Sequence, residues 1–545
     1  MSKKSVPPRP KNVNKPELIF DKKYLYLIAF IEGGSVMAIE LTGAKMIAPF
    51  FGTSLYVWAS VLAVTLGGLA AGYFAGGWAT YRFSTQKILF WELLAGTLLI
   101  ALMPFLALKF MSLTGNLGLR LGSLFSSLSF MFLPLFCMGM ISPTIIQLQN
   151  RELKGTGKTA GTIYAISTIG GIIMTLLMGF YLLPEWGIRK SVLLSAILLG
   201  SMAILVVIIG RKQKTESIIG IFTLVILSIA SVKSFSDANG SSVKYLYWSE
   251  GILGQLTVVE QKTDEHTRNL FINQIPQTLV NPGKLPASLW KYPHRIAMIA
   301  SIKPENSKAL MIGLGGGSIA MELKKMGFSV DAVELDKRVP DVAEKYFGFE
   351  PDGINVYVDD GRHFIRTAEK KYDLVVIDVL NGEIQPYHMF TMESFEEIKR
   401  ILEPDGMLII NNQGFLLGKK GLGTRSIYKT LAESGFKVKY YFAGDANNSA
   451  DIHFIASPVD FNIFFNPSEK INACCKNYPV DYHSLVIDIE VVAAGKNLDL
   501  RDAEILTDDK PALVALYNYS FEEWRSKALQ NLLANRNAQQ IPLFH

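Results

Sequence analysis

The feature that most constrains this chain is a series of long apolar runs confined to its first 235 residues. An apolar run needs about 20 residues to cross the hydrocarbon core of a bilayer as a helix. Seven runs reach that length, near residues 24–47, 55–80, 88–110, 121–148, 159–183, 190–210 and 217–235. Several are rich in glycine, which lets helices pack closely where no hydrophobic effect drives them together. The sequence therefore predicts an N-terminal all-α multi-pass transmembrane bundle of about seven helices.

The composition changes near residue 236, and this change indicates more than one domain. The 545 residues are too many for one ordinary domain, and only the later part has the composition of a soluble protein. We predict a disordered basic tail over 1–23, a transmembrane helical bundle over 24–235, a linker over 236–247, a small β subdomain over 248–284 and a Rossmann-like α/β domain over 285–545. Alternating segments at 252–260 and 268–273 predict that the small subdomain contains a β-hairpin.

Three ionisable residues lie inside the first apolar run: Glu32, Glu40 and Lys45. Ionisable groups at membrane depth usually face the interior of a bundle or a water-filled cavity. They indicate either a polar cavity on a substrate route or side chains that reach the membrane surface near the ends of the run, and both alternatives stay open. Glu92, near the start of the third run, is expected at the membrane surface.

Residues 308–334 have the pattern of a nucleoside-binding unit. An apolar run ends at Gly313, a turn rich in glycine follows, and a helical pattern then leads into a second apolar run that ends at Glu334. Glycines let the backbone turn sharply and let a ligand approach the main chain. An acid about 20 residues further on can accept hydrogen bonds from two ribose hydroxyls. An ordinary turn between a strand and a helix, with no ligand, is the alternative.

Acidic residues follow the next two predicted strands as well. The strand near 354–358 leads to Asp360, and the strand after it ends at Asp378. Together with the strands that end at Gly313 and Glu334, they give four strand ends in succession. Ligands bind beyond the carboxyl ends of the strands in a doubly wound sheet. We therefore predict that these four residues share one site.

Several motifs of the second half occur together in a known family. They are Gln277-Thr278, Ile312 to Ser318, Val333 to Asp336, Asp359 to Gly361, Val376 to Asp378, Pro386, His388, Thr391 to Phe395 and Leu402 to Gly406. From about Trp248 to Pro511, the chain resembles the spermidine synthase (polyamine aminopropyltransferase) family. The whole chain is similar to the bacterial membrane-fused spermidine synthase-like proteins, which it resembles also at Tyr56 to Trp58 and in its glycine-rich second run.

The resemblance implies a donor, decarboxylated S-adenosylmethionine, and no tightly bound cofactor. It implies that the nucleoside turn is shaped by Gly313, Gly315 and Gly317, that Glu334 holds the ribose hydroxyls, that Asp360 lies at the adenine and that Gln277 belongs to the same cosubstrate site. Asp378 matches the catalytic aspartate of the family. The implied fold is a Rossmann-like, methyltransferase-type α/β domain with a small β-hairpin subdomain.

The chemistry of such a transfer suits these residue types. The donor is a sulfonium and its leaving group is a neutral thioether, so the reaction needs alignment more than stabilisation of an oxyanion. The acceptor amine must lose a proton before it attacks, and a carboxylate in a partly dry pocket can take that proton. We assign this role to Asp378; a helix cap or turn acid is the alternative interpretation.

Three positions depart from the pattern of the family. The glycine turn has Gly316 where the family carries an aspartate for the donor's amine, and Asn381 replaces a second acid three residues after Asp378. The donor-contacting glutamine of the hairpin falls at Gly254, with Gln255 one residue away. An unpaired buried ammonium is strongly disfavoured. We therefore expect the nucleoside site to be kept, and the identity of the putrescine-like acceptor stays open.

Two other functions remain as alternatives. The first is an S-adenosylmethionine-dependent methyltransferase, which the missing acids at Gly316 and Asn381 favour. The second is a transporter bundle with a nucleoside-sensing domain that does not catalyse a reaction, which Glu32, Glu40 and the small-residue runs favour.

Composition and charge limit the partners. The net charge of +6 comes partly from the N-terminal tail, and no basic stripe with interleaved aromatics occurs, so nucleic acid is not an expected partner. Cys137, Cys474 and Cys475 have neither metal-site nor disulfide-framework spacing. We expect a lipid bilayer and a small amine as partners, no metal, and leave open a homodimer.

We expect the chain to span the cell membrane several times. The basic loops predict that its N-terminus lies in the cytoplasm. Seven spans would then put the second half outside, whereas a domain that uses a nucleoside cosubstrate is expected in the cytoplasm. The sequence does not resolve this conflict.

Overall fold

The computed structural model describes most of the chain. The described residues are 21–83, 85–149, 155–210, 243–251, 253–262, 266–380, 385–442, 449–461, 498–510 and 512–517, with 219, 223, 520 and 523. They form two compact units, one made mostly of apolar helices and the other containing both β-sheets.

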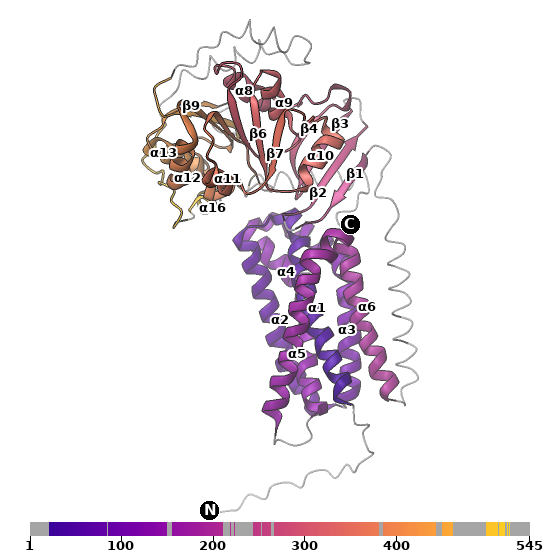
Figure 1. Cartoon of the computed structure of the whole chain (residues 1–545). Coiled ribbons are helices and arrows are strands. Elements are labelled where there is room, and N and C mark those ends of the chain that lie inside the picture. The colour runs from indigo at the N-terminus through magenta and orange to yellow at the C-terminus, as the bar shows by residue number, and fades with distance from the viewer. Residues whose placement is uncertain are drawn as a thin grey trace, which may run out of the picture. The chain divides into compact units, whose positions relative to one another are not determined.

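The apolar part of the chain is helical throughout its described residues (Figure 1). The helices are α1 (Lys22–Phe51), α2 (Leu55–Arg82), α3 (Thr85–Thr114), α4 (Gly118–Gln149), α5 (Thr156–Leu177) and α6 (Gly187–Gly210). Five continuous helical stretches are long and apolar enough to cross a membrane, and the last of them, Thr156–Ile209, takes in two of the predicted runs. The predicted all-α bundle is confirmed, and its seventh run, 217–235, lies almost wholly outside the described residues.

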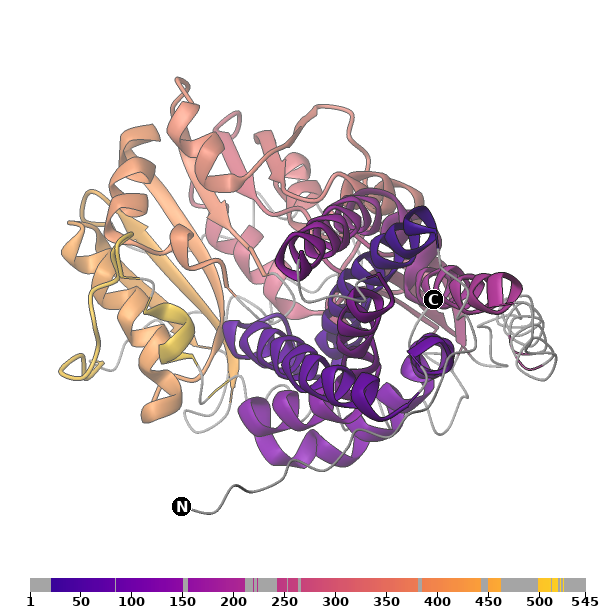
Figure 2. The same cartoon turned by 90° about the horizontal axis from the view of Figure 1, so that it is seen from below.

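Figure 2 shows the helices of the apolar part seen from below. Several of their glycines lie where two helix backbones approach each other. A Cβ atom added to Gly33 of α1 would lie 1.9 Å from the carbonyl oxygen of Ser167 in α5, and one added to Gly170 would lie 2.0 Å from that of Phe30. The backbones of α1 and α5 are therefore in direct contact. Small residues permit this close approach, as the sequence pattern predicted.

Two carboxylates are buried among the helices. Glu32 is 2% exposed and accepts a hydrogen bond of 2.9 Å from the Ser167 hydroxyl. Glu92 is 5% exposed and accepts one of 3.0 Å from the Thr144 hydroxyl. Glu32 therefore faces the interior of the bundle. Glu92 is buried against α4, and the expectation that it lies near the membrane surface stays a prediction.

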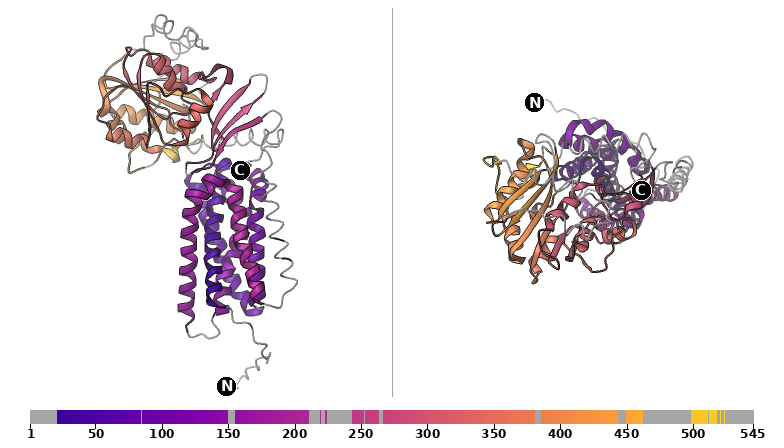
Figure 3. Two further views of the ribbon diagram at one scale, coloured as in Figure 1. Left: turned by 45° about the vertical axis from the view of Figure 1, so that its right-hand side comes forward. Right: turned by 90° about the horizontal axis from the view of Figure 1, so that it is seen from above.

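The smaller sheet contains four antiparallel strands in the order β1-β2-β3-β4 (Figure 3). They are β1 (Val243–Ser249), β2 (Leu256–Gln261), β3 (Thr267–Ile272) and β4 (Ile275–Val280). The predicted hairpin is the central pair, β2 and β3. Strand β1 takes in residues 243–247, which the sequence assigned to the linker over 236–247, because the serine-rich start of that segment obscured the alternation that follows.

The larger sheet has seven strands in the order β10-β11-β9-β8-β5-β6-β7. They are β5 (Lys308–Ile312), β6 (Ser329–Glu334), β7 (Ile354–Val358), β8 (Tyr372–Ile377), β9 (Leu402–Gly414), β10 (Lys437–Phe442) and β11 (Ala450–Ser457). Strands β5 to β9 pair in parallel, and β11 runs antiparallel to both β9 and β10. This arrangement confirms the predicted Rossmann-like α/β class.

Helices cover both faces of the larger sheet. One face packs on α8 (Lys291–Ala300), α9 (Ser318–Lys325) and α10 (Arg338–Phe347), and the other on α11 (Gly361–Thr367), α12 (Met392–Ile401) and α13 (Leu422–Glu433). Along β5, Met311 enters the first core and Leu310 the second. Because both faces are covered, the central strands are continuous apolar runs and not alternating ones.

Candidate active site

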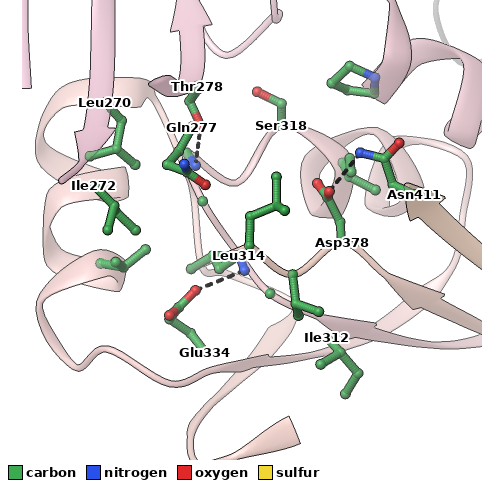
Figure 4. A pocket seen from close by; sticks show the side chains of 18 of the residues that line it. Leu270, Ile272, Gln277, Thr278, Ile312, Leu314, Ser318, Glu334, Asp378 and Asn411 are labelled. Atoms are coloured by element: carbon green, nitrogen blue, oxygen red, sulfur yellow. Dashed lines mark hydrogen bonds between the residues drawn. The ribbon is translucent and has the colours of Figure 1, made fainter. Parts of the chain in front are cut away.

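The carboxyl ends of the parallel strands lie around one cavity of about 890 Å³ (Figure 4). Strand β5 is central, with β6 and β7 on one side and β8 on the other. Gly313, Glu334, Asp360 and Asp378 all line the cavity, as does Gln277 from β4 of the smaller sheet. The structure thus brings together the four strand-end residues that the sequence singled out.

The glycine turn after β5 requires glycine for two separate reasons. The predicted glycines Gly313, Gly315 and Gly317 have φ angles of 90°, 54° and 82°, a region that other residues rarely adopt. A Cβ atom at Gly313 would also lie 2.2 Å from the carbonyl oxygen of Asp378. Gly313 and Gly315 line the cavity, whereas Gly317 precedes α9 and packs against Phe349.

Thr278 of β4 contacts the glycine turn, and this contact explains why a glycine stands at position 316 and not the aspartate of the family pattern. The Gly316 amide donates a hydrogen bond of 2.9 Å to the Thr278 hydroxyl oxygen. A Cβ atom at Gly316 would lie 2.5 Å from the Thr278 methyl carbon. No aspartate fits at position 316 while Thr278 occupies this place. Sequence reasoning quoted Thr278 only as part of a motif and missed its contact.

Glu334 lies at the end of β6, opposite the glycine turn. Its Oε2 accepts a hydrogen bond of 3.0 Å from the Leu314 amide, and its Oε1 accepts one of 2.9 Å from the Asp336 amide. Burial raises the pKa of Glu334, and these backbone donors oppose the shift. Each carboxylate oxygen can accept a second hydrogen bond, so both remain usable by a ligand with neighbouring hydroxyls.

Asp360 combines a structural contact with a place in the cavity wall. Its Oδ1 caps α11 by accepting hydrogen bonds of 2.9 Å and 3.0 Å from the amides of Arg362 and His363. Its Oδ2 lies 3.4 Å from His388 Nε2, and the side chain is 40% exposed. One oxygen is therefore used by the helix, and the other faces the cavity.

Of the polar residues that the sequence singled out near the smaller sheet, Gln277 lines the cavity and Gln255 does not. Gln277 lines it and donates a hydrogen bond of 3.3 Å to the carbonyl oxygen of Ile275. Gly254 has a φ of 119°, and a Cβ atom there would lie 2.6 Å from the Asn273 side chain, so no glutamine fits. The neighbouring Gln255 is buried and donates a hydrogen bond of 2.7 Å to Glu250. Asn381 lies outside the described residues.

Asp378 lies where β8 leaves the sheet, between two hydrogen-bond donors that sequence reasoning missed. Asn411 Nδ2, from β9, donates a bond of 2.8 Å to Oδ1, and the Tyr292 hydroxyl, from α8, donates one of 3.3 Å to Oδ2. Burial raises the pKa of Asp378 to about 6, and the two donors oppose this shift. Burial, and next the Asp378 charge, hold the pKa of Tyr292 well above its ordinary value. The Asp378 carboxylate is thus buried, held by two donors and more easily protonated than an ordinary aspartate.

A second acid lines the cavity on the far side of β9. Asp451 of β11 accepts a hydrogen bond of 2.9 Å from Arg295 of α8. The sequence signal for both was weak, because they lie outside the strand-end motifs. No cluster of three metal-ligating side chains occurs among the residues that the structure describes.

Comparison with known proteins identifies the domain around this cavity. The spermine/spermidine synthase domain family matches residues 292–444. The polyamine aminopropyltransferase of Vibrio vulnificus is 38% identical over 114 residues, which make up 20% of this chain and 38% of that protein. Polyamine aminopropyltransferase 2 of Aquifex aeolicus is 23% identical over 516 residues, 90% of this chain and 98% of that protein. The spermidine synthase structure from Thermotoga maritima covers 45% of this chain and 84% of its own, with 19% identity and a TM-score of 0.37.

These matches confirm the family resemblance that the sequence motifs indicated. Residues 292–444 match the spermine/spermidine synthase domain family, and the similarity to the Aquifex protein extends over the apolar half as well. The Vibrio match spans 38% of that relative, and the match to a probable polyamine aminopropyl transferase of Bifidobacterium longum spans 26% of its length. The named relatives are transferases, in agreement with the enzyme class expected from the sequence.

Proposed function

We propose that this protein is a membrane-bound aminopropyltransferase of the spermidine synthase type. It transfers the aminopropyl group of decarboxylated S-adenosylmethionine to a small amine, with Asp378 as the base. The observation that carries this proposal is the placement of Asp378, a carboxylate with a pKa of about 6, in the same cavity as Glu334 and the glycine turn. The spermine/spermidine synthase domain match supports it.

The β6 and β7 side of the cavity is the nucleoside end in this proposal. Glu334 accepts the two ribose hydroxyls, Asp360 Oδ2 contacts the adenine, and Gly313 and Gly315 let the donor lie against the main chain. Leu270 and Ile272 of β3 supply apolar wall, and Gln277 a polar group, on the side of the smaller sheet (Figure 4).

The reaction is a displacement at carbon. The lone pair of the acceptor nitrogen forms a new bond to the aminopropyl carbon beside sulfur, and the carbon–sulfur bond breaks with its electron pair moving to sulfur. The leaving group is neutral methylthioadenosine, and the proton of the amine passes to Asp378. A carboxylate with a pKa near 6 is ionised at neutral pH, so it attracts the ammonium and accepts the proton. Tyr292 and Asn411 orient it.

The proposal is tested with the purified full chain. We expect mass spectrometry of mixtures of the decarboxylated donor with single amines to show an aminopropylated product, and calorimetry to show binding of methylthioadenosine. Asp378→Asn should lower kcat by at least about 100-fold and leave nucleoside binding intact, whereas Glu334→Ala should weaken that binding. Asp352→Asn, on an exposed turn, is the matched control. A wild-type chain that does not bind the nucleoside would contradict the proposal.

One observation favours methyl transfer as a second candidate. Thr278 fills the place of the aspartate that the family pattern assigns to the donor's amine, so the tail of the donor meets no acid at position 316. Turnover with intact S-adenosylmethionine, and none with the decarboxylated donor, would select the methyltransferase.

We further propose that the apolar helices insert in the cell membrane and that the catalytic domain lies in the cytoplasm, where adenosyl donors are made. The length and hydropathy of the five helical stretches support insertion. Digestion of the second half by a protease added to intact spheroplasts would contradict the proposed side.

A further inference from the structure

Helix α8 contacts two acids of the cavity from a single face. Tyr292 and Arg295 are three residues apart, so their side chains lie on one side of the helix. The Tyr292 hydroxyl donates to Asp378, and Arg295 Nη2 donates to Asp451. Strand β9 lies between the strands that carry the two acids, so their backbones are roughly 10 Å apart, two strand spacings. Both acids line the cavity.

The two members of the Arg295–Asp451 pair differ in accessibility. The Arg295 side chain is 7% exposed and that of Asp451 is 27% exposed. The guanidinium lies over the Tyr441 ring, 5.3 Å from its centroid, and its Nε has no hydrogen-bond partner among the described residues. Both side chains line the cavity, and the carboxylate is the more exposed of the two.

One carboxylate oxygen of Asp451 is available to a ligand. Its Oδ2 accepts the bond from Arg295, and within the described ranges its Oδ1 accepts none. Burial raises the pKa of Asp451, and the charge of Arg295 opposes this. A second cation at Oδ1 would stabilise the ionised carboxylate further. Among the described residues no other basic side chain contacts Asp451, so the cation of a ligand can take this place.

We propose that Asp451 binds the far ammonium of a diamine acceptor and that Arg295 is the positioning residue that holds Asp451 toward the cavity. This inference rests on the proposed function, in which Asp378 takes the proton of the near amine. A separate anion is then needed for the far ammonium, because a buried unpaired charge is costly. Asp451 supplies such an anion from β11, two strands away from β8 and in the wall of the same cavity.

The test compares three acceptors that share a chain of four carbons and differ at its far end: putrescine carries an ammonium there, butylamine ends in a methyl, and γ-aminobutyrate ends in a carboxylate. In the wild type we expect a KM for putrescine at least about tenfold below that for butylamine. Asp451→Asn should raise the KM for putrescine about tenfold and leave kcat and the KM for butylamine nearly unchanged. Arg295→Gln should have the same effect, and Arg295→Lys should restore part of the difference.

Loss of fold is separated from loss of the subsite by calorimetry. Each variant must bind methylthioadenosine as the wild type does, since Glu334 and the glycine turn are untouched. Binding of putrescine to the complex of the chain with methylthioadenosine is measured in the same way, so the result does not depend on turnover.

The outcomes divide clearly. Equal KM values for putrescine and butylamine in the wild type, or a preference for γ-aminobutyrate, would overturn the inference, and the latter would assign the substrate contact to Arg295. If no amine reacts but Asp451→Asn abolishes putrescine binding, the subsite stands and the proposed transfer fails. If putrescine reacts and Asp451→Asn leaves its KM unchanged, the transfer stands and the subsite is overturned.

Discussion

At the scale of single residues, the environment of Asp378 sets its chemistry. Burial makes the carboxylate harder to ionise, while the donors Asn411 and Tyr292 favour the charged form. His453 of β11 is fully buried and stacks on Tyr441, with ring centroids 5.8 Å apart. Burial lowers the pKa of His453 to about 3, so this imidazole stays neutral while Asp378 titrates.

The first prediction at this scale is a pH profile. A base acts only when it is deprotonated, so kcat/KM should fall as the pH drops through about 6, the pKa of Asp378. Asn411 stabilises the ionised form, and its removal in Asn411→Leu should move this limb up by about one pH unit. The measurement is kcat/KM against pH with saturating donor.

His388 also lines the cavity, where its Nε2 lies 3.4 Å from Asp360 Oδ2. His388→Gln is therefore the control and should leave the limb in place. A limb that vanishes in His388→Gln and does not move in Asn411→Leu would contradict the assignment to Asp378.

At the scale of elements, the turn between β5 and α9 connects two parts of the cavity. One is the part proposed to bind the nucleoside, and the other is Asp378, the proposed base. Gly313 has a φ of 90° and lies against the backbone of Asp378, so this one residue shapes the turn and also limits where Asp378 can lie. We predict that Gly313→Ala destabilises the domain by about 2–4 kcal/mol, from the strained φ and the overlap together. It should also abolish the binding of methylthioadenosine.

Gly353 offers a matched control in the turn before β7. Its φ is 74°, but the nearest atom to an added Cβ is Lys324 Cε at 3.9 Å. Gly353→Ala should cost only about 1–2 kcal/mol, from backbone strain alone, and bind the nucleoside normally. Chemical denaturation and calorimetry check both variants, and equal losses in the two would show that overlap with Asp378 contributes nothing.

At the scale of the whole molecule, two units are stabilised by different means. The soluble part buries apolar side chains on both faces of a sheet, whereas the apolar helices pack backbone against backbone at glycine. We predict that Gly170→Ala, whose Cβ would lie 2.0 Å from the Phe30 carbonyl oxygen, separates α1 from α5 and destabilises the bundle by about 1–3 kcal/mol. Thermal unfolding of the full chain in detergent measures this.

Gly77 of α2 is the comparison, because an added Cβ there meets no atom within 4 Å among the described residues. Gly77→Ala should be neutral or raise the melting temperature, since alanine favours a helix over glycine by about 1 kcal/mol. The packing argument fails if both variants melt alike.

How much of the fold and of the site could be predicted depended on how far apart in the sequence the interacting residues lie. Strands β5, β6 and β8 were predictable because they pair in parallel and are buried on both faces, so that each is a mainly apolar run, and the residues at their ends follow directly. Strand β1 was missed because its pattern begins inside a polar segment. The burial of Glu92 was missed because its partner, Thr144, lies on another helix.

The sequence by itself determined the class of fold and the strand-end residues that line the cavity, since glycine spacing, strand ends and the acids that follow β6 and β8 are local features. Only the tertiary structure decided what surrounds Asp378. Tyr292, Asn411, Asp451 and Arg295 come from α8, β9 and β11, and folding brings them to one edge of the sheet. Desolvation and pairing of charges depend on such distant neighbours, and no short stretch of sequence encodes them.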